Sequence, residues 1–200
     1  MIAIIDYGVG NLRSVQKAFE AVHAEAVITS DRSEITQAER VVLPGVGAFG
    51  ECARRLRESG LDQVVLEAAS QSKPLLGLCV GLQLMFDEGH EFGVHKGLGL
   101  MPGRVVRFPE DGPHVPQIGW NQIENPKPHP LLREMPDGTY FYFVHSYFVE
   151  PANRDDVLAV TEYGIRYPSI CARGSVCGVQ FHPEKSQDAG LRLLANFARM

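Results

Sequence analysis

The sequence predicts a three-layer α/β fold, in which a mostly parallel sheet carries helices on both faces and is extended by antiparallel strands. Strand and helix signals alternate through the first half, and the strands there are apolar throughout. Strands of that kind are typical of parallel sheets buried on both faces. In the second half, little helix separates the strand signals. With 200 residues and 44% hydrophobic content, we expect one domain, residues 1–200, with a sizeable core.

Four short apolar runs in the first half predict parallel strands, at residues 2–5, 26–29, 40–43 and 74–78. Apolar residues recur at helical spacing over residues 12–22, 50–70 (broken near Gly60) and 80–86. Asn11 is a favourable N-cap residue for the first of these helices. Glycine-rich turns follow Ile5 and Leu43 and surround Cys79. Because sites in such sheets gather beyond the carboxyl ends of the strands, we expect the active site at these turns.

The second half contains strand signals at residues 104–108, 118–123, 140–148, 157–161, 169–172 and 176–181. We expect antiparallel strands added to the main sheet. Residues 140–148 are apolar on both faces, which predicts a central strand with His145 as a core histidine. An amphipathic helix near Leu191, Leu194 and Phe197 closes the chain. The histidines at 23, 90, 95, 114 and 129 have no evident partners, and we expect them at the surface.

Composition excludes several classes of function. A net charge of −5 argues against nucleic-acid binding, because nothing supplies a general basic face for phosphates, although a local positive patch stays open. No apolar run approaches the roughly 20 residues of a membrane helix. The opening residues 1–6 lack the features of a secretory signal, so we expect a cytoplasmic protein.

The four cysteines form no Cys-x-x-Cys pair and complete no zinc spacing, so we expect neither metal nor cofactor. Cys171 and Cys177 flank the predicted turn at Arg173 and Gly174. They could face each other across a hairpin, but in a reducing compartment buried thiols are the favoured prediction.

Cys79 lies in Gly77-Leu-Cys79-Val-Gly81, at a predicted strand-to-helix junction. The motif has the form of a nucleophile elbow with cysteine in place of serine. Neighbours without side chains let strand and helix approach closely, and the helix N-terminus favours the thiolate. The alternative is a buried cysteine in an ordinary β-α turn.

Phe181-His182-Pro-Glu184 offers that cysteine a base. Pro183 favours an extended conformation at His182, and residues two apart in an extended segment point the same way. Glu184 would then bond one imidazole nitrogen while the other faces Cys79, as the acid of a catalytic triad does. Taken alone, the motif also fits a surface turn.

Pro44-Gly-Val-Gly47 follows the third strand and predicts an oxyanion loop. Acyl transfer needs backbone N–H donors aimed at the developing oxyanion. The N–H of Val80, directly after the nucleophile, is one expected donor, and the peptides of Gly45, Val46 and Gly47 are candidates for the second. A tight β-α turn is the simpler alternative.

These motifs resemble those of the triad (class I) glutamine amidotransferases. The resemblance rests on Gly77-Leu-Cys-Val-Gly-Leu-Gln83, Pro44-Gly-Val-Gly-Ala-Phe49 and His182-Pro-Glu-Lys-Ser186. Further motifs are similar to the branch that supplies ammonia for histidine biosynthesis: Asp6-Tyr-Gly-Val-Gly-Asn11, Gly119-Trp-Asn121 and Tyr142-Phe-Val-His-Ser-Tyr147. Residues 87–97 and 109–117 match no pattern of the family and receive no role.

The resemblance implies a flavodoxin-like fold and a glutaminase that forms a thioester at Cys79, with His182 shuttling the proton and Glu184 holding His182. It makes Gln83, at i+4 from Cys79, a contact to L-glutamine, although a helix-capping or core amide is the alternative. Ser146 and Tyr147 would line the glutamine pocket through their backbone.

The resemblance also implies a heterodimer, in which ammonia passes through the (β/α)8 barrel of a cyclase subunit that makes imidazole glycerol phosphate and AICAR. Asn11, Trp120 and Lys185 lie in motifs expected near that interface. Trp120 suits an interface anchor, with a core tryptophan as the alternative. Low glutaminase activity without the partner is expected, and the peptides of residues 44–47 are candidates for the switch.

Two other functions stay open from the residues alone. The chain could be a cysteine hydrolase or redox-responsive protein that uses Cys79 on another acyl substrate or a peroxide. It could instead be a non-catalytic binding module with structural glycine turns. The pairing of the elbow with His182 and Glu184 argues against the binding module, because structure alone requires neither.

Overall fold

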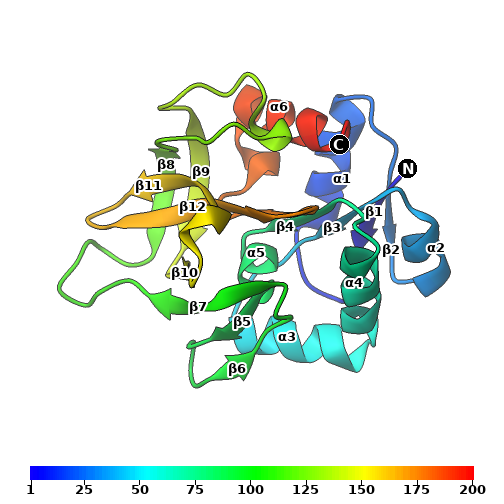
Figure 1. Ribbon diagram of the computed structural model, residues 1–200, viewed down its shortest axis with the longest axis horizontal. Coiled ribbons are helices and arrows are strands. Elements are labelled where there is room, and N and C mark those ends of the chain that lie inside the picture. Colours follow the sequence, from blue (N-terminus) through cyan, green and yellow to red (C-terminus); the bar gives the residue numbers. More distant parts are fainter.

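The main sheet has seven strands in the order β11-β12-β13-β4-β3-β1-β2, in a computed structural model that describes residues 1–200 (Figure 1). These strands are β1 (Ile2–Ile5), β2 (Ala26–Thr29), β3 (Arg40–Leu43), β4 (Leu75–Leu78), β11 (Val157–Glu162), β12 (Arg166–Arg173) and β13 (Val176–Val179). The five from β2 to β13 are parallel, while β12 and β11 are antiparallel additions. Their order 2-1-3-4-5 is the flavodoxin-like order, as predicted.

Helices cover both faces of this sheet, which confirms the three-layer prediction (Figure 1). The helices are α1 (Leu12–Ala21), α2 (Arg32–Gln37), α3 (Phe49–Glu58), α4 (Leu61–Ser70), α5 (Val80–Leu84) and α6 (Gln187–Phe197). The core on one face joins α1 and α6, where the rings of Phe19 and Phe197 lie 6.3 Å apart. The core on the other face joins α3, α4 and α5. Each core contains 27 buried residues, so the sheet is apolar on both sides, as the sequence indicates.

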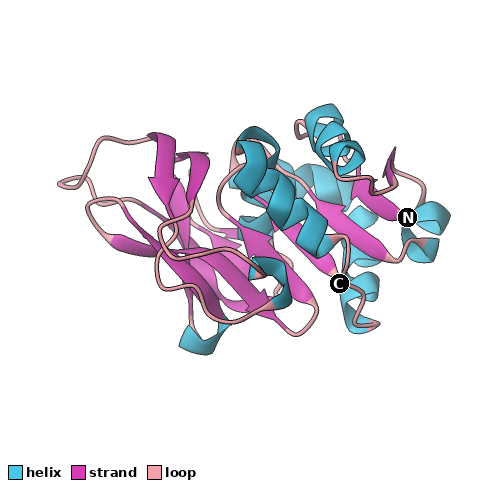
Figure 2. Cartoon of the chain, turned by 90° about the horizontal axis from the view of Figure 1, so that it is seen from above, coloured by secondary structure: helices cyan, strands magenta, loops and turns pink.

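The remaining strands form two smaller sheets at the end of the molecule away from both termini (Figure 2). They are β5 (Phe86–Gly89), β6 (His95–Lys96), β7 (Met101–Arg107), β8 (Gln117–Gln122), β9 (Tyr140–His145) and β10 (Tyr147–Pro151). One sheet has the order β10-β7-β5-β6, and β8 pairs only with β9. The prediction that the later strands join the main sheet is therefore wrong for β7, β8, β9 and β10, whereas β5 and β6 were not predicted. The strand predicted at 176–181 does join the main sheet as β13, but it runs parallel to β4 rather than antiparallel.

The predicted central strand over residues 140–148 is also wrong, because the segment divides at Ser146 into β9 and β10, which belong to different sheets. In β9, Phe141, Phe143 and His145 are buried, whereas the residues between them are half-buried. One face of β9 therefore packs on the core and the other faces outward. The apolar outer residues, which suggested a central strand, form a surface instead.

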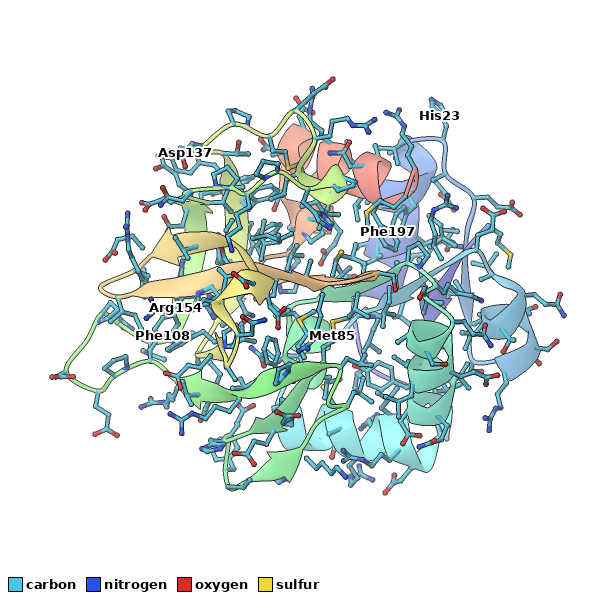
Figure 3. All side chains as sticks on the ribbon, in the orientation of Figure 1. His23, Met85, Phe108, Asp137, Arg154 and Phe197 are labelled. Carbon is cyan, nitrogen blue, oxygen red and sulfur yellow. The ribbon has the colours of Figure 1, made fainter.

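An aromatic cluster joins the small sheets to the main sheet around Phe108. Its ring lies 5.0 Å from that of Phe148 and 5.2 Å from that of Tyr167 in β12. Phe108 and Met85 lie inside the molecule, while His23 and Asp137 lie at its edge (Figure 3). This cluster holds β9 and β10 beside the carboxyl end of the main sheet.

All four cysteines are free and buried, as expected for Cys171 and Cys177. The two lie in the β12–β13 hairpin, but Cys171 pairs with Gly178 and Cys177 pairs with Ala172. The offset of one residue sends their side chains to opposite faces of the sheet. Each packs in a different core, so the fold keeps them apart.

The longest helix, α6, has 11 residues, and no helix of the chain has the length and apolarity that a membrane span requires.

We predict that Gly81→Ala lowers the free energy of unfolding by about 3 kcal/mol, because overpacking between two backbones cannot relax by a change of rotamer. A Cβ at Gly81 would overlap the carbonyl oxygen of Leu43 in β3. Urea denaturation measures the change. Gly174→Ala is the matched control, since Gly174 has φ +59° but open space around it, and should lose only about 1 kcal/mol. Equal losses in the two variants would contradict the packing argument.

Candidate active site

Cys79 occupies a strained turn between β4 and α5, with φ 53° and ψ −109°. Its N–H donates to the carbonyl of Val179 at 2.9 Å, which ties the turn to β13. A Cβ on Gly77 would lie 2.6 Å from the nitrogen of Leu82. Strand and helix thus approach as closely as the sequence predicts for a nucleophile elbow, and such strained geometry is typical of functional sites.

The helix after Cys79 is shorter than predicted, since α5 ends at Leu84 and Phe86 already belongs to β5. Two N–H groups from the following segment bond the last carbonyls of the helix. The N–H of Leu98 donates to the carbonyl of Leu84, and the N–H of Leu100 donates to that of Met85, both at 2.8 Å. A helix of five residues has only a small dipole. Direct hydrogen-bond donors near Cys79 therefore matter more for the thiolate than the sequence suggested.

His182 and Glu184 form a buried pair, with 2.8 Å between imidazole Nδ1 and carboxylate Oε1. Nδ1 must carry the proton that it donates to Glu184, which leaves Nε2 for Cys79. His182 is extended as predicted, with φ −102° and ψ 95°. Glu184 does not lie in an extended segment, because Pro183 begins a 3₁₀ turn at Pro183–Lys185. The pair therefore forms across a helical turn.

Backbone bonds hold His182 in place. Its N–H donates to the carbonyl of Tyr142 in β9 at 2.9 Å. The Ser186 hydroxyl donates to the His182 carbonyl at 2.6 Å and accepts from the Tyr142 N–H at 3.0 Å. The base is thereby fixed to both β9 and the start of α6.

The charge state of His182 is set by its two neighbours. Burial alone lowers the pKa of the imidazole, but the hydrogen bonds and charges of Cys79 and Glu184 outweigh burial and raise the pKa to about 10. This direction favours a protonated imidazole between Cys79 and Glu184. The site can therefore hold a nucleophile and a proton donor together.

Two buried side chains donate hydrogen bonds to carbonyl groups of the predicted oxyanion loop. The Tyr7 hydroxyl donates to the carbonyl of Pro44 at 2.7 Å, and the Cys52 thiol donates to that of Val46 at 3.3 Å. Burial raises the pKa of Cys52 to about 11 and also raises the pKa of Tyr7, so both keep their protons. Gly47 has φ +96° and open space around its Cα. The loop is thus anchored at two carbonyls and free at Gly47.

A cavity of about 390 Å³ opens above Cys79, a size typical of small-ligand sites. The predicted residues that line it are Val46, Gly47, Cys79, Val80, Gln83, Ser146, Tyr147, His182 and Lys185. His145 lines it too, although we expected only a core histidine. Glu184 lies behind His182, outside the lining. Gly45 is also outside, because it packs against Val80 and Tyr7, where a Cβ would lie 2.9 and 3.0 Å from their side chains.

Gln83 is both a core amide and a cavity residue. Its Nε2 donates to the carbonyl of Tyr147 at 3.0 Å and to Oε1 of Gln180 at 3.1 Å. These bonds use both amide hydrogens and leave Oε1 of Gln83 as an acceptor for a ligand. Nε2 of Gln180 in turn lies 3.7 Å from the sulfur of Cys79.

His145 is buried, and both ring nitrogens have partners: Nδ1 lies 2.9 Å from the carbonyl of Tyr147, and Nε2 lies 3.1 Å from the hydroxyl of Tyr167. Burial lowers the pKa of His145 to about 4, so the ring is neutral at pH 7. Two other histidines also have partners, contrary to expectation. His90 bonds Glu88 at 2.7 Å, and His129 accepts from the Leu131 N–H at 3.2 Å.

Of the predicted partner residues, only Lys185 lines the cavity, and Trp120 shares a neighbour with it, the ring of Tyr142. Trp120 is 46% exposed on β8, which rules out the core alternative. Its ring lies 6.2 Å from that of Tyr142, and the Lys185 ammonium lies 5.8 Å from the same tyrosine ring. Asn11 precedes α1, but its side chain makes no capping bond, contrary to expectation.

Three further residues line the cavity that no sequence motif indicated: Glu91, Pro116 and Val144. Glu91 and Pro116 fall in the two segments that received no role. Glu91 is the only acidic side chain of the lining, and its Oε2 accepts from the Phe49 N–H at the start of α3 at 2.7 Å. No local pattern marks Glu91, because the fold alone brings residue 91 to residue 49.

Residues 3–200 match the model of the family described as glutamine amidotransferase class-I. Three similar proteins are called imidazole glycerol phosphate synthase subunit HisH. The protein of Salinibacter ruber is 51% identical, that of Symbiobacterium thermophilum 50% and that of Syntrophotalea carbinolica 48%. Each match covers all of this chain and, in the same order, 94%, 93% and 100% of the relative's length.

Solved structures share the fold at low sequence identity. A crystal structure of a glutamine amidotransferase superposes with a TM-score of 0.77 at 19% identity, covering all of both chains. The structure of PurLQS from Thermotoga maritima gives 0.77 at 17% identity, covering 99% of this chain and 97% of that one.

We predict that the His182 imidazole titrates far above the usual value of about 6.5. Because its folded pKa is raised to about 10, the stability it contributes is fully present below pH 6.5 and is lost as pH rises toward 10. NMR titration of ¹³C-labelled histidines measures the midpoint, which Cys79→Ala and Glu184→Gln should each lower. His145, with its pKa lowered to about 4, is the internal control. A His182 midpoint at or below 6.5 would contradict the buried ion pair.

Proposed function

This chain belongs to the class-I glutamine amidotransferase family, and from that membership we propose that it is the glutaminase subunit of imidazole glycerol phosphate synthase. It hydrolyses L-glutamine to glutamate and ammonia. The observation that carries the proposal is one cavity that contains Cys79, His182 and Gln83, with Glu184 bonded behind His182. Relatives of 48–51% identity over the whole chain support the choice within the family.

The proposed reaction begins when the Cys79 thiolate attacks the side-chain carboxamide carbon of glutamine. A C–S bond forms, and negative charge develops on the carbonyl oxygen. When the C–N bond breaks, the His182 imidazolium gives its proton to the nitrogen, and ammonia leaves. His182 then takes a proton from water, the hydroxide attacks the thioester, and glutamate departs from Cys79. Glu184 stabilises the imidazolium throughout.

The cavity offers groups that suit the α-amino acid end of glutamine. The free Oε1 of Gln83 and the carboxylate of Glu91 can both accept from an α-ammonium group. The backbone of Ser146 and Tyr147 lines the same space. We assign recognition of the α-ammonium group to Gln83 and Glu91. We assign positioning of the glutamine side-chain amide to the backbone of Ser146 and Tyr147.

The oxyanion donors in this proposal are the N–H of Val80 and a peptide of the Val46–Gly47 segment, with Gly45 serving as a packing residue. One hydrogen bond from Cys52 holds the Val46 carbonyl, and the open space at the Cβ position of Gly47 leaves room for the Val46–Gly47 peptide to rotate away from this bond. We propose that partner binding completes the oxyanion hole by such a rotation, so that the lone subunit is slow.

The outer face of the β8–β9 hairpin is the proposed docking surface for a cyclase with a (β/α)8 barrel. Cross-strand pairing places Ile118 opposite Val144, and Trp120 opposite Tyr142. Ile118 is 63% exposed, while Val144 lines the cavity, so this apolar face runs to the cavity mouth. A heterodimer formed here would enclose the exit of ammonia, with Lys185 at the rim and Asn11 at a second contact.

We further propose that the chain works as a single domain, residues 1–200, in the cytoplasm. Two cores on one continuous sheet and four free thiols support this assignment. Glutamine cleavage is a hydrolysis, whereas the heterodimer acts as a lyase that yields imidazole glycerol phosphate and AICAR.

We predict that Cys79→Ala abolishes glutamine-dependent product formation by the reconstituted heterodimer and leaves ammonia-dependent formation intact. The experiment incubates the chain with glutamine, alone and with the cyclase plus its phosphoribosyl ligand, and measures glutamate. Wild-type glutamate release should rise steeply when partner and ligand are present. Absence of glutamate in both conditions would refute the proposed function.

We predict that Trp120→Ala weakens cyclase binding about 30-fold, corresponding to the roughly 2 kcal/mol of an aromatic hot spot. Calorimetric titration measures the dissociation constant. Phe92→Ala is the control, because Phe92 is also large, apolar and exposed but lies outside the β8–β9 face. Equal affinities for the wild type and the Trp120 variant would place the interface elsewhere.

A further inference from the structure

Gln180 is a fully buried amide that contacts the sulfur of Cys79. It follows β13, where Val179 pairs with Leu78 of β4, so the register sets Gln180 beside Cys79. Its Nε2 lies 3.7 Å from the Cys79 sulfur, a hydrogen-bond distance for the large sulfur atom. His182, two residues further on, also forms a hydrogen bond with the Cys79 side chain. Gln180 and His182 therefore approach the same atom.

The orientation of the Gln180 amide follows from its neighbours. The carbonyl of Tyr147 can only accept, so the group of Gln83 that faces it, 3.0 Å away, must be the amino group. The second hydrogen of this amino group goes to the Gln180 side chain at 3.1 Å, which must present its oxygen there. The amino group of Gln180 is then the one that points at Cys79. A flipped amide would bring two donors together at Gln83 and an oxygen to the sulfur.

A buried thiol needs such a donor to ionise. Burial raises the pKa of Cys52 to about 11 and that of Cys177 to about 12. Cys79 is only 4% exposed, and the five-residue α5 gives it a small helix dipole. Hydrogen bonds to an ion are stronger than those to a neutral group, so an N–H donor stabilises a thiolate more than a thiol.

We infer that Gln180 is a catalytic residue whose side-chain amide donates a hydrogen bond to the Cys79 thiolate and keeps it ionised before glutamine is attacked. This inference rests on the proposed function and deepens it. The chain Gln83–Gln180–Cys79 also links the amide that faces the α-ammonium group to the nucleophile. No proton transfer through Gln180 is involved, and the bond made and broken at sulfur is the thioester bond described above.

The test measures thiolate directly, by the rate at which iodoacetamide alkylates Cys79 in the full chain between pH 5 and 10. Gln180→Leu and Gln180→Met both remove the N–H donor and replace the amide by an apolar side chain of similar size. Each should lower the alkylation rate at pH 7 about tenfold and raise the pH of half-maximal rate by about one unit. Cys79→Ala gives the background of the other three cysteines.

Gln117→Leu is the matched control, because Gln117 is an equally buried glutamine that bonds Tyr167 and lies outside the cavity lining. It should leave the alkylation profile unchanged. If Gln180 served only to hold Gln83, its variants would raise KM for glutamine and keep the wild-type alkylation profile. That result would overturn the inference. Failure of the proposed function is distinct, since it would appear as no glutamate from the wild-type heterodimer.

A measurement on the unchanged side chain covers the case in which the Gln180 variants do not fold. In chain labelled with ¹⁵N-glutamine, the side-chain amide signal of Gln180 should shift as Cys79 titrates. The same signal should show no such step in Cys79→Ala. A Gln180 signal that ignores the titration in the wild type would count against the hydrogen bond.

Discussion

The close approach of α5 to β3 and β4 is the constraint on which the site depends. Gly81 lies against the Leu43 carbonyl, and Gly77 lies against the backbone of Leu82, so neither position has room for a side chain. Between these two glycines, Cys79 has a positive φ of 53° and lines the cavity. The close approach also brings Val80 next to Gly45, which places the N–H after the nucleophile beside the loop that follows β3. Backbone packing thus determines where the proposed nucleophile and both proposed oxyanion elements meet.

A second set of constraints is polar and converges on the carbonyl of Tyr147. This carbonyl lies within hydrogen-bond distance of Gln83 and of His145. Burial lowers the pKa of His145 to about 4, so the ring adds no positive charge beside the His182 imidazolium. Because each buried amide has only one orientation that satisfies its neighbours, the network specifies one arrangement of the pocket. The proposed glutamine pocket and the proposed nucleophile, Cys79, are therefore parts of one hydrogen-bonded unit.

Much of this structure was predictable because its signals are local. Each of three local patterns predicts its geometry from a few neighbouring residues: the apolar strands, the glycines around Cys79 and the motif from His182 to Glu184. The failures involve contacts between distant segments. The apolar outer face of β9 suggested a central strand because sequence cannot distinguish burial in a core from exposure on an apolar surface. Gln180 looked like any residue of a strand, since its importance comes from a neighbour 101 positions away. Glu91 reaches the cavity only because its loop closes on the start of α3.

The two halves of the proposed catalytic apparatus, His182 with its partners and the loop at Gly47, differ in how firmly the chain holds them. His182 has its ring bonded to Glu184 and its backbone bonded to Tyr142 and Ser186. Gly47 has φ +96° and no atom near the place of a Cβ, next to a half-exposed valine. In the proposed function, a partner has little to change at the nucleophile and much to change at the oxyanion loop. Such control acts on the transition state, where one N–H donor is typically worth a factor of roughly 100 to 1000 in rate. A subunit built this way can keep a prepared nucleophile and still release little ammonia until the cyclase is in place.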